Sequence, residues 1–402
     1  MKRIIILCDG TWNRSDSKTP TNVVQLAQAI EPIDPIGIVQ VPIYIQGVGT
    51  GEGVTSVSRK LDALLGGAFG WGLLENIEEA YRHLVFLYEL GDEIYIFGFS
   101  RGAYTARSLT GFIRSTGIVN RDALNRIPEA IRRYRTLNKP KRTHPSSDES
   151  HAFRADLSPR VVTSPKEAAW REKNGLPEAP LLKIAFLGVW DSVGALGVPA
   201  HIPILGEWAK RRYRFHDADL SSMVSGARHA VAIDERRRSF EPTRWTNVAE
   251  LNAEAEDPKA EPYRELFFAG DHGSIGGGGD IRDLSSIALR WMIEGADKAG
   301  LKFDAKRLEA IRAEEDPMGP LRNTKKPSTG FVDWLTRLFP RDRTGPNRMA
   351  ELHPSVLTRW AGEAKSSAFR PYRPGTLAAV YEEIAAYSEQ KSSADAPPTR
   401  VA

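Results

Sequence analysis

Residues 91–103 read Gly-Asp-Glu-Ile-Tyr-Ile-Phe-Gly-Phe-Ser-Arg-Gly-Ala, and the end of this stretch matches the pattern G-x-S-x-G with Ser100 at its centre. The apolar run before Ser100 predicts a buried strand, and residues 103–107 after it predict a helix. A serine on a sharp turn between a strand and a helix adopts strained backbone angles, and the flanking glycines let the two elements pass closely. The stretch therefore predicts a nucleophile at Ser100, with the amide of Arg101 as one donor to an oxyanion.

Similar apolar runs recur along the chain and are separated by segments of helical periodicity. The further predicted strands are Arg3–Cys8, Val39–Gln46, Lys183–Trp190 and Arg264–Ala269, and the predicted helices are Trp71–Leu90, Ala103–Ile113 and Leu284–Ala299. Continuously apolar strands that alternate with helices are typical of a mostly parallel sheet covered on both faces. We therefore predict an α/β fold of the α/β-hydrolase type, with surface insertions.

A serine nucleophile needs a base and an acid that orients the base, and in this fold the chain order is Ser, then Asp or Glu, then His. Asp191 directly follows a predicted strand, and His272 follows another. Both positions are carboxyl ends of strands, where the sites of α/β proteins assemble. We predict Ser100, Asp191 and His272 as the catalytic residues. The remaining candidates are the bases His229 and His353, the acids Asp234 and Asp271, and the less favoured histidines His83, His144, His151, His201 and His216.

The segment Asp9-Gly10-Thr11 ends the first predicted strand and allows two interpretations. The amide of Gly10 or Thr11 would supply the second oxyanion donor, because a loop after an early strand has this role in the fold. The segment is also similar to the Asp-x-Asp-Gly-Thr signature of haloacid-dehalogenase-type phosphatases, which would make the chain a metal-dependent phosphohydrolase using Asp9. The position of that family's nucleophile is Leu7 here, so we favour the first interpretation. No His/Cys cluster has metal-ligand spacing, and we expect neither a metal nor another cofactor.

The domain organisation is predicted from shifts in composition. Residues 1–305 are expected to form the catalytic domain, with a surface insertion at 138–180 that could act as a lid. Residues 306–387 are expected to be a helical or irregular extension packed on this domain, and residues 388–402 a disordered tail. Within the extension, an aromatic stripe with basic flanks would either pack on the catalytic domain or touch a membrane surface; it consists of Phe331, Trp334, Leu335, Leu338 and Phe339.

The composition excludes several classes of protein. Of 402 residues, 41% are hydrophobic and 26% are charged, which is typical of a globular chain. The single cysteine, Cys8, excludes an internal disulfide framework and follows an apolar run, so we expect it in the core. No signal peptide or membrane-spanning stretch is apparent, which predicts a cytoplasmic protein as synthesised and leaves export without a cleaved signal open. The net charge of +4 comes without a nucleic-acid reader motif, so no nucleic-acid partner is expected, and the sequence indicates no oligomeric state.

Together the motifs resemble an α/β-hydrolase family long classed as a domain of unknown function and now associated with the catalytic domain of type VI secretion phospholipase effectors. The segments that carry the resemblance are Cys8–Asn13, Gly47–Gly51, Gly98–Tyr104, Val189–Gly194, Arg228–Ala230, Asp234–Arg237, Phe240 with Pro242 and Trp245, Gly270 with His272 and Gly276–Gly278, Leu289–Met292, His353–Val356 and Tyr372–Pro374. The resemblance implies a triad of Ser100, Asp191 and His272, and hydrolysis of a fatty-acyl ester, with a phospholipid or other lipid as partner and transient contact with a membrane surface. A catalytically silent binding protein on the same fold is the alternative.

Overall fold

The computed structural model describes residues 1–11, 13–48, 67–136, 144–194, 219–237, 240–325, 341–362 and 371–394. In these residues six parallel strands form one sheet in the order β2-β1-β3-β4-β5-β6. The strands are β1 (Arg3–Cys8), β2 (Gln40–Ile45), β3 (Glu93–Phe99), β4 (Ile184–Trp190), β5 (Ala227–Ala232) and β6 (Tyr263–Phe268). The prediction of an α/β fold built on a parallel sheet is confirmed.

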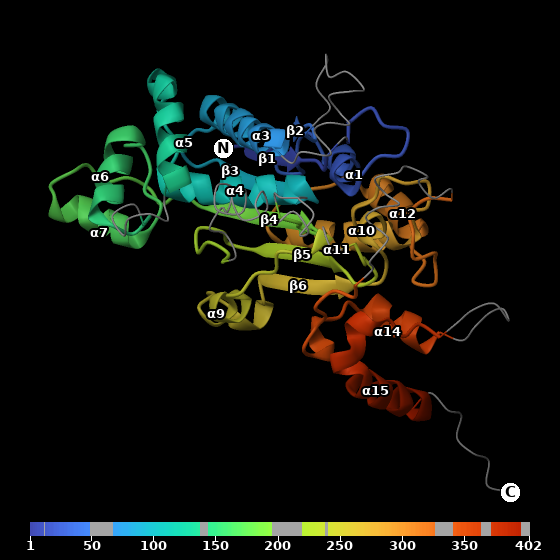
Figure 1. Cartoon of the computed structure of the whole chain (residues 1–402). Coiled ribbons are helices and arrows are strands. Elements are labelled where there is room, and N and C mark those ends of the chain that lie inside the picture. The colour runs from blue at the N-terminus through green and yellow to red at the C-terminus, as the bar shows by residue number, and fades with distance from the viewer. Residues whose placement is uncertain are drawn as a thin grey trace, which may run out of the picture.

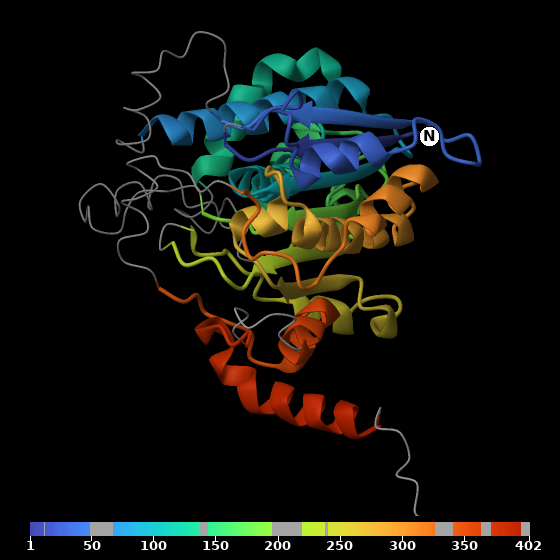
Figure 2. The ribbon, with the colours of Figure 1, turned by 90° about the vertical axis from the view of Figure 1, so that its right-hand side faces the viewer.

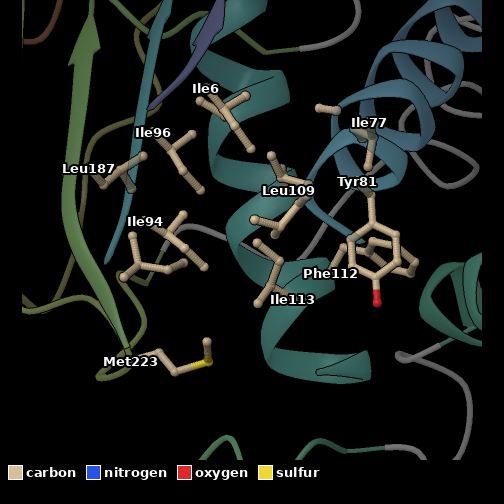
Figure 3. Close-up of a cluster of buried hydrophobic side chains, with 14 of the residues drawn as sticks. Ile6, Ile77, Tyr81, Ile94, Ile96, Leu109, Phe112, Ile113, Leu187 and Met223 are labelled. Carbon is tan, nitrogen blue, oxygen red and sulfur yellow. The ribbon is translucent and has the colours of Figure 1, made fainter. Parts of the chain in front are cut away.

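Helices cover both faces of the sheet (Figures 1 and 2). One face packs against α3 (Gly67–Leu87), α4 (Arg101–Thr116), η1 (Arg121–Arg126) and α5 (Ile127–Thr136), and the other against α1 (Asn22–Ala29), α11 (Asp283–Lys298) and α12 (Ala305–Ala313). Every residue of β1 is buried, so Ile4 and Ile6 enter one core while Ile5 and Leu7 enter the other. Figure 3 shows strand isoleucines of the first core facing Leu109 and Ile113 of α4. Burial on both faces explains why the strands read as continuous apolar runs.

Strand β5 is the strand that the sequence analysis missed. It contains Arg228 and His229, which interrupt the apolar pattern, yet its six residues are all buried. The guanidinium of Arg228 lies 4.7 Å from the ring centre of Trp291, and the ring of His229 bonds to Glu265 on β6. Because tertiary partners satisfy both polar side chains, the strand stays in the middle of the sheet without an apolar sequence.

The described part of the insertion predicted at 138–180 lies far from Ser100. In its described part, residues 144–180, it folds as α6 (Asp148–Leu157) and α7 (Pro165–Lys173), held by a buried ion pair of 2.7 Å between Arg154 and Glu167. Ser158 donates a hydrogen bond of 2.7 Å to the carbonyl of Thr116, the last residue of α4. Helix α4 is 16 residues long, about 24 Å, and begins beside Ser100. These residues therefore lie at the opposite end of the sheet, and the suggestion that they act as a lid was wrong for this part (Figure 1).

The residues after α12 cover the free edge of the sheet at β6 (Figures 1 and 2). They form η5 (Met349–Glu351), α14 (Pro354–Ala361), η6 (Gly375–Val380) and α15 (Tyr381–Ala394), whose apolar side chains share a core with Val231, Ile233 and Phe267. The amide of His353 donates a hydrogen bond of 3.0 Å to the carbonyl of Phe267. Helix α15 continues to Ala394, so residues 388–394 are helical where a disordered tail was expected. The aromatic stripe at 331–339 lies outside the described residues.

Two smaller predictions concern Cys8 and membrane insertion. Cys8 ends β1 with 1% of its surface exposed, and burial, followed by the negative charge of Asp9, raises the pKa of its thiol. It is therefore a core residue and not a reactive thiol. Among the described helices, none combines the length and the apolar character that crossing a bilayer requires.

Candidate active site

Ser100 occupies the sharp turn between β3 and α4. Its backbone angles are φ 58° and ψ −121°, a strained conformation for a residue with a side chain. A Cβ atom on Gly98 would lie 2.3 Å from the carbonyl oxygen of Gly102, and one on Gly102 would lie 2.2 Å from that of Cys8. Side chains at these positions would collide with backbone, so the close passage of β1, β3 and α4 requires both glycines. The turn leaves the hydroxyl of Ser100 at the carboxyl end of the sheet.

The structure brings Ser100, His272 and Asp191 together in a hydrogen-bonded chain. Nε2 of His272 lies 2.8 Å from Oγ of Ser100, and Nδ1 lies 2.5 Å from Oδ2 of Asp191. An ionised carboxylate only accepts hydrogen bonds, so Nδ1 carries the proton and Nε2 is free to accept the proton of the hydroxyl. The three side chains come from the ends of β3, β4 and β6, and 172 residues separate Ser100 from His272.

Aromatic side chains and a helix cap fix the ring of His272. The ring lies between Phe99, with ring centres 4.7 Å apart, and Phe240, with ring centres 4.8 Å apart. His272 is also the first residue of α10 (His272–Gly276), and the side chain of Asp271 caps this helix by accepting from the amide of Ser274. Only 6% of the surface of His272 is exposed. These contacts therefore oppose rotation of the ring away from Ser100.

The carboxylate of Asp191 is fully buried and accepts four hydrogen bonds. Besides His272, the amide of Ala232 donates to Oδ1 at 3.0 Å, and the guanidinium of Arg343 donates to Oδ1 at 2.7 Å and to Oδ2 at 2.9 Å. Burial alone would raise the pKa of Asp191, but the charge of Arg343 and the contacts with His272 outweigh it, so the pKa lies well below its usual range. The carboxylate is therefore ionised throughout the neutral range.

Arg343 is a site residue that the sequence analysis missed. It lies 152 residues after Asp191, in a stretch that also contains Arg341 and Arg348, yet its side chain is 1% exposed. No local motif marks the position, since the partner of Arg343 becomes apparent only when the C-terminal segment folds against the sheet.

The predicted oxyanion donors lie on either side of Ser100. Arg101 is the first residue of α4, and a Cβ atom on Gly10 would lie 3.3 Å from Cβ of Ser100. The amide of Gly10, however, already donates a hydrogen bond of 2.7 Å to its neighbour Asp9. The expectation that Gly10 serves as an oxyanion donor is therefore corrected, which leaves Thr11 as the candidate of that pair.

Asp9 anchors the loop that carries Gly10 and Thr11. Its carboxylate is 2% exposed and accepts hydrogen bonds of 2.7 Å from the hydroxyl of Thr21 and from that of Tyr44, besides the one from Gly10. Burial raises the pKa of Asp9 in spite of these hydrogen bonds. A carboxylate whose two oxygens are both bonded in this way is a structural residue, and these contacts do not favour its use as the nucleophile of a phosphohydrolase.

His229, a rival base, forms a second relay beside the first one. Its Nδ1 lies 2.8 Å from Oε2 of Glu265, and its Nε2 accepts a hydrogen bond of 3.1 Å from the amide of Ser192. The other oxygen of Glu265 accepts from Nε of Arg244 at 2.6 Å. His229 thus fixes the backbone of Ser192, the residue that follows Asp191. Asp191 itself has a strained φ of 40°.

The other rival residues also have structural contacts. His353 caps α14 and stacks on Phe268 with ring centres 4.4 Å apart. Asp234 accepts hydrogen bonds of 2.7 Å from the amide of Gly270 and from the hydroxyl of Tyr372. Of the acids considered, Asp191 is the one that contacts the ring of His272 among the described residues.

Comparisons with known proteins include a match to a family model, a curated relative and two solved structures. The family model for the catalytic domain of Tle1-like phospholipase effectors of the type VI secretion system matches residues 2–295. An uncharacterized protein of Saccharomyces cerevisiae is 29% identical over 252 residues, 61% of this chain, which spans only 33% of the yeast protein's length. Among solved structures, the Tle1 effector bound to the VgrG spike of the type 6 secretion system is 17% identical, with a TM-score of 0.36 over 70% of this chain and 52% of the other. An uncharacterized protein from Pseudomonas aeruginosa is 17% identical, with a TM-score of 0.39 over 100% of this chain and 60% of the other.

Proposed function

Because the chain belongs to the family of Tle1-like phospholipase effector catalytic domains, as its sequence motifs predicted, we propose that it is a serine hydrolase that cleaves the acyl ester of a lipid, in particular a phospholipid. The observation that carries this proposal is the continuous chain of hydrogen bonds from the hydroxyl of Ser100 through His272 to Asp191, at 2.8 and 2.5 Å. A hydroxyl, an imidazole and a carboxylate in this order are the groups that acyl transfer requires.

The reaction has two halves. In the first, Oγ of Ser100 attacks the ester carbonyl while Nε2 of His272 takes the hydroxyl proton, and the resulting imidazolium returns that proton to the departing alcohol. In the second, water attacks the acyl-serine with His272 again as the base, and the free acid leaves. Asp191 keeps the proton of the imidazole on Nδ1 and stabilises the positive charge on the ring in both halves.

The negative charge on the carbonyl oxygen needs donors on the side away from His272. We assign this role to the amide of Arg101, at the amino end of α4, and to the amide of Thr11. A helix amino terminus adds a favourable partial positive charge at this position. Binding of the oxyanion there would orient the acyl chain away from the ring of His272.

The first test replaces the nucleophile and a nearby serine that has no assigned role. Ser100→Ala should lower kcat/KM for fatty-acid release from phosphatidylcholine micelles by about 10⁴-fold or more. Ser108→Ala is the matched control, because Ser108 lies in the same helix and its buried hydroxyl has no hydrogen-bond partner among the described residues. The measurement is fatty-acid release by mass spectrometry, with lipids of different head groups and acyl lengths.

Labelling by a fluorophosphonate separates the alternatives. The probe should modify the wild type and Ser108→Ala but not Ser100→Ala. Turnover that survives in Ser100→Ala would exclude the proposed nucleophile. A wild type that hydrolyses no ester and takes up no probe would instead support a catalytically silent binding protein on this fold.

A further inference from the structure

Resting on the function proposed above, we propose that Arg343 is a positioning residue of the active site, which holds the carboxylate of Asp191 in the orientation that accepts the Nδ1 proton of His272. The family match ends at residue 295, so this residue lies in the C-terminal extension beyond the matched part of the chain. The extension would then contribute to catalysis as well as covering the edge of the sheet.

The guanidinium of Arg343 is held by contacts that fix its plane. Two of its nitrogens donate to the two oxygens of Asp191, at 2.7 and 2.9 Å, in the bidentate arrangement that sets both the position and the rotation of a carboxylate. The same nitrogens also donate to the carbonyl of Ala232, at 3.0 Å, and to the carbonyl of Phe240. The ring of Phe240 packs edge-on against His272. Arg343 therefore binds both Asp191 and the backbone of a residue that contacts the ring of His272.

The backbone around Arg343 is pinned to the catalytic domain next to the site. The amide of Arg341 donates a hydrogen bond of 3.0 Å to the carbonyl of Arg236, and Asp342 forms an ion pair of 3.0 Å with the side chain of Arg236. Arg236 lies in the segment that follows β5, as does Phe240. The backbone on the amino side of Arg343 is therefore fixed by its own contacts with Arg236. These contacts limit the positions from which the side chain of Arg343 can reach Asp191.

The charge of Arg343 affects the protonation of the relay. Among the described residues, the titratable or charged groups that contact Asp191 are His272 on α10 and Arg343 on the extension, and the ion pair of Glu235 with Arg237 after β5 lies against the backbone amide of His272. Without the guanidinium, the pKa of Asp191 would rise from its value in the wild type, because fewer partners would oppose the effect of burial. A protonated Asp191 could no longer accept the Nδ1 proton, so the loss of Arg343 should remove activity from the acidic side of the pH profile first.

Arg359 provides a matched control. It is also an arginine of the extension, 4% exposed, and its guanidinium packs 5.2 Å from the ring centre of Tyr372. Its hydrogen bonds go to the backbone carbonyls of Pro317 and Gly319, at 2.7 Å each, and not to the active site. Arg359→Met should therefore reproduce the general cost of removing a buried arginine from this region.

The experiment measures kcat/KM against pH for the full-length wild type, Arg343→Met, Arg343→Lys, Arg359→Met and Ser100→Ala. Arg343→Met should lower kcat/KM on the order of 100-fold, the effect of misplacing a catalytic group by about 1 Å. Its acidic limb should move to higher pH by on the order of one unit. Arg343→Lys keeps the charge but has a single donor nitrogen in place of the planar fork, so it should keep the acidic limb of the wild type and recover part of the rate. Arg359→Met should keep the rate and the limb.

Proton NMR supplies a readout that does not depend on turnover. The proton between Nδ1 of His272 and Asp191, and that between Nδ1 of His229 and Glu265, should both resonate far downfield, and His272→Gln and His229→Gln assign them. Arg343→Met should shift or abolish the signal of the proton between His272 and Asp191 and leave that of His229 unchanged. If Arg343→Met does not fold, the same measurement on Arg343→Lys tests the positioning role of Arg343.

The outcomes distinguish the two proposals. If the wild type is no more active than Ser100→Ala, the proposed ester hydrolysis fails, while the NMR signals still test the role of Arg343. If the wild type is active and the Arg343 variants match Arg359→Met in rate, pH profile and signals, the inference about Arg343 is overturned.

Discussion

Two neighbouring clusters in this protein combine the same three kinds of side chain, a histidine, a carboxylate and an arginine, in different surroundings. Each consists of a histidine whose Nδ1 contacts a buried carboxylate, and an arginine that binds the same carboxylate. The first histidine cluster is His272, Asp191 and Arg343. The second histidine cluster is His229, Glu265 and Arg244. In both, burial opposes ionisation of the carboxyl, but its histidine and arginine partners outweigh burial and lower the pKa.

The clusters differ at Nε2 of the histidine. In the first, Nε2 faces the hydroxyl of Ser100, a group that can pass on its proton when its oxygen forms a new bond. In the second, Nε2 accepts from the backbone amide of Ser192, which keeps its proton under all ordinary conditions. A histidine paired with a carboxylate therefore does not by itself define a catalytic base, and the third partner decides the role.

Their positions in the sheet explain this difference. His229 lies in the middle of β5, opposite Glu265 in the parallel register of β5 and β6. His272 lies beyond the end of β6, at the first residue of α10, where its ring can reach a turn from another strand. Only the ends of parallel strands bring side chains from several strands to one point that a substrate can approach.

The largest difference between the two clusters should appear in activity when each histidine is replaced in turn. His272→Gln should lower kcat/KM by about 10⁴-fold, because it removes the base while the amide side chain keeps a similar volume. His229→Gln should keep activity within about tenfold of the wild type, since it affects the site only through Ser192 and the backbone of Asp191. Steady-state kinetics on one lipid ester compares the two, and equal losses would show that the second cluster also takes part in proton transfer.

A second prediction concerns stability, for which His229 should matter more than His272. His229→Leu removes the acceptor of the buried Ser192 amide and one of the partners of Glu265, which keeps Arg244 and the amide of Trp245, so it should lower the free energy of unfolding by about 2–3 kcal/mol. His272→Leu should cost less, because Asp191 keeps its three other hydrogen bonds from Ala232 and Arg343. Urea unfolding followed by tryptophan fluorescence measures both, and a less costly change at His229 would contradict its structural role.

Most of the sheet was predictable because its strands are buried on both faces and therefore read as apolar runs. The run of Arg3–Cys8 and that of Glu93–Phe99 coincide with β1 and β3. Strand β5 was not predicted because Arg228 and His229 interrupt its apolar residues. The partners of these two side chains, Trp291 and Glu265, lie far away in the sequence. Helices α6 and α7 escaped for the same reason, since the buried pair of Arg154 and Glu167 replaces an apolar stripe.

The three residues proposed for the triad could be named from the sequence because each lies within three residues of the end of a predicted strand. The role of Gly10 could not be predicted, because its amide is taken up by the side chain of Asp9, a contact that no pattern of residue types reveals. Arg343 could not be predicted either, because its segment carries no strand or motif and finds Asp191 only through tertiary packing. Strand ends are local features of the sequence, whereas hydrogen-bond partners are not.

A third histidine sharpens the comparison, because it is largely buried without any carboxylate. His353 stacks on Phe268, and its Nδ1 bonds to Ser355 at the start of α14. Burial, followed by the charges of Arg290, Arg264 and Arg228, lowers the pKa of His353 to about 3 from an ordinary value of 6.5. In the two clusters a carboxylate offsets such effects, whereas none of the carboxylates in the described part of the chain pairs with His353.

His353 should therefore make the fold sensitive to acid, by a smaller amount than the effects above. Below about pH 6.5 the unfolded chain binds a proton at this position and the folded protein does not, so stability falls as the pH falls toward 3. His353→Asn keeps a side chain suited to capping α14 but cannot titrate. Between pH 6.5 and 5 the wild type should lose about 1 kcal/mol more than this variant, a value reduced for the part of the ring that water reaches. Urea unfolding at the two pH values measures the difference, and parallel losses in the two proteins would mean that His353 takes up its proton without unfolding.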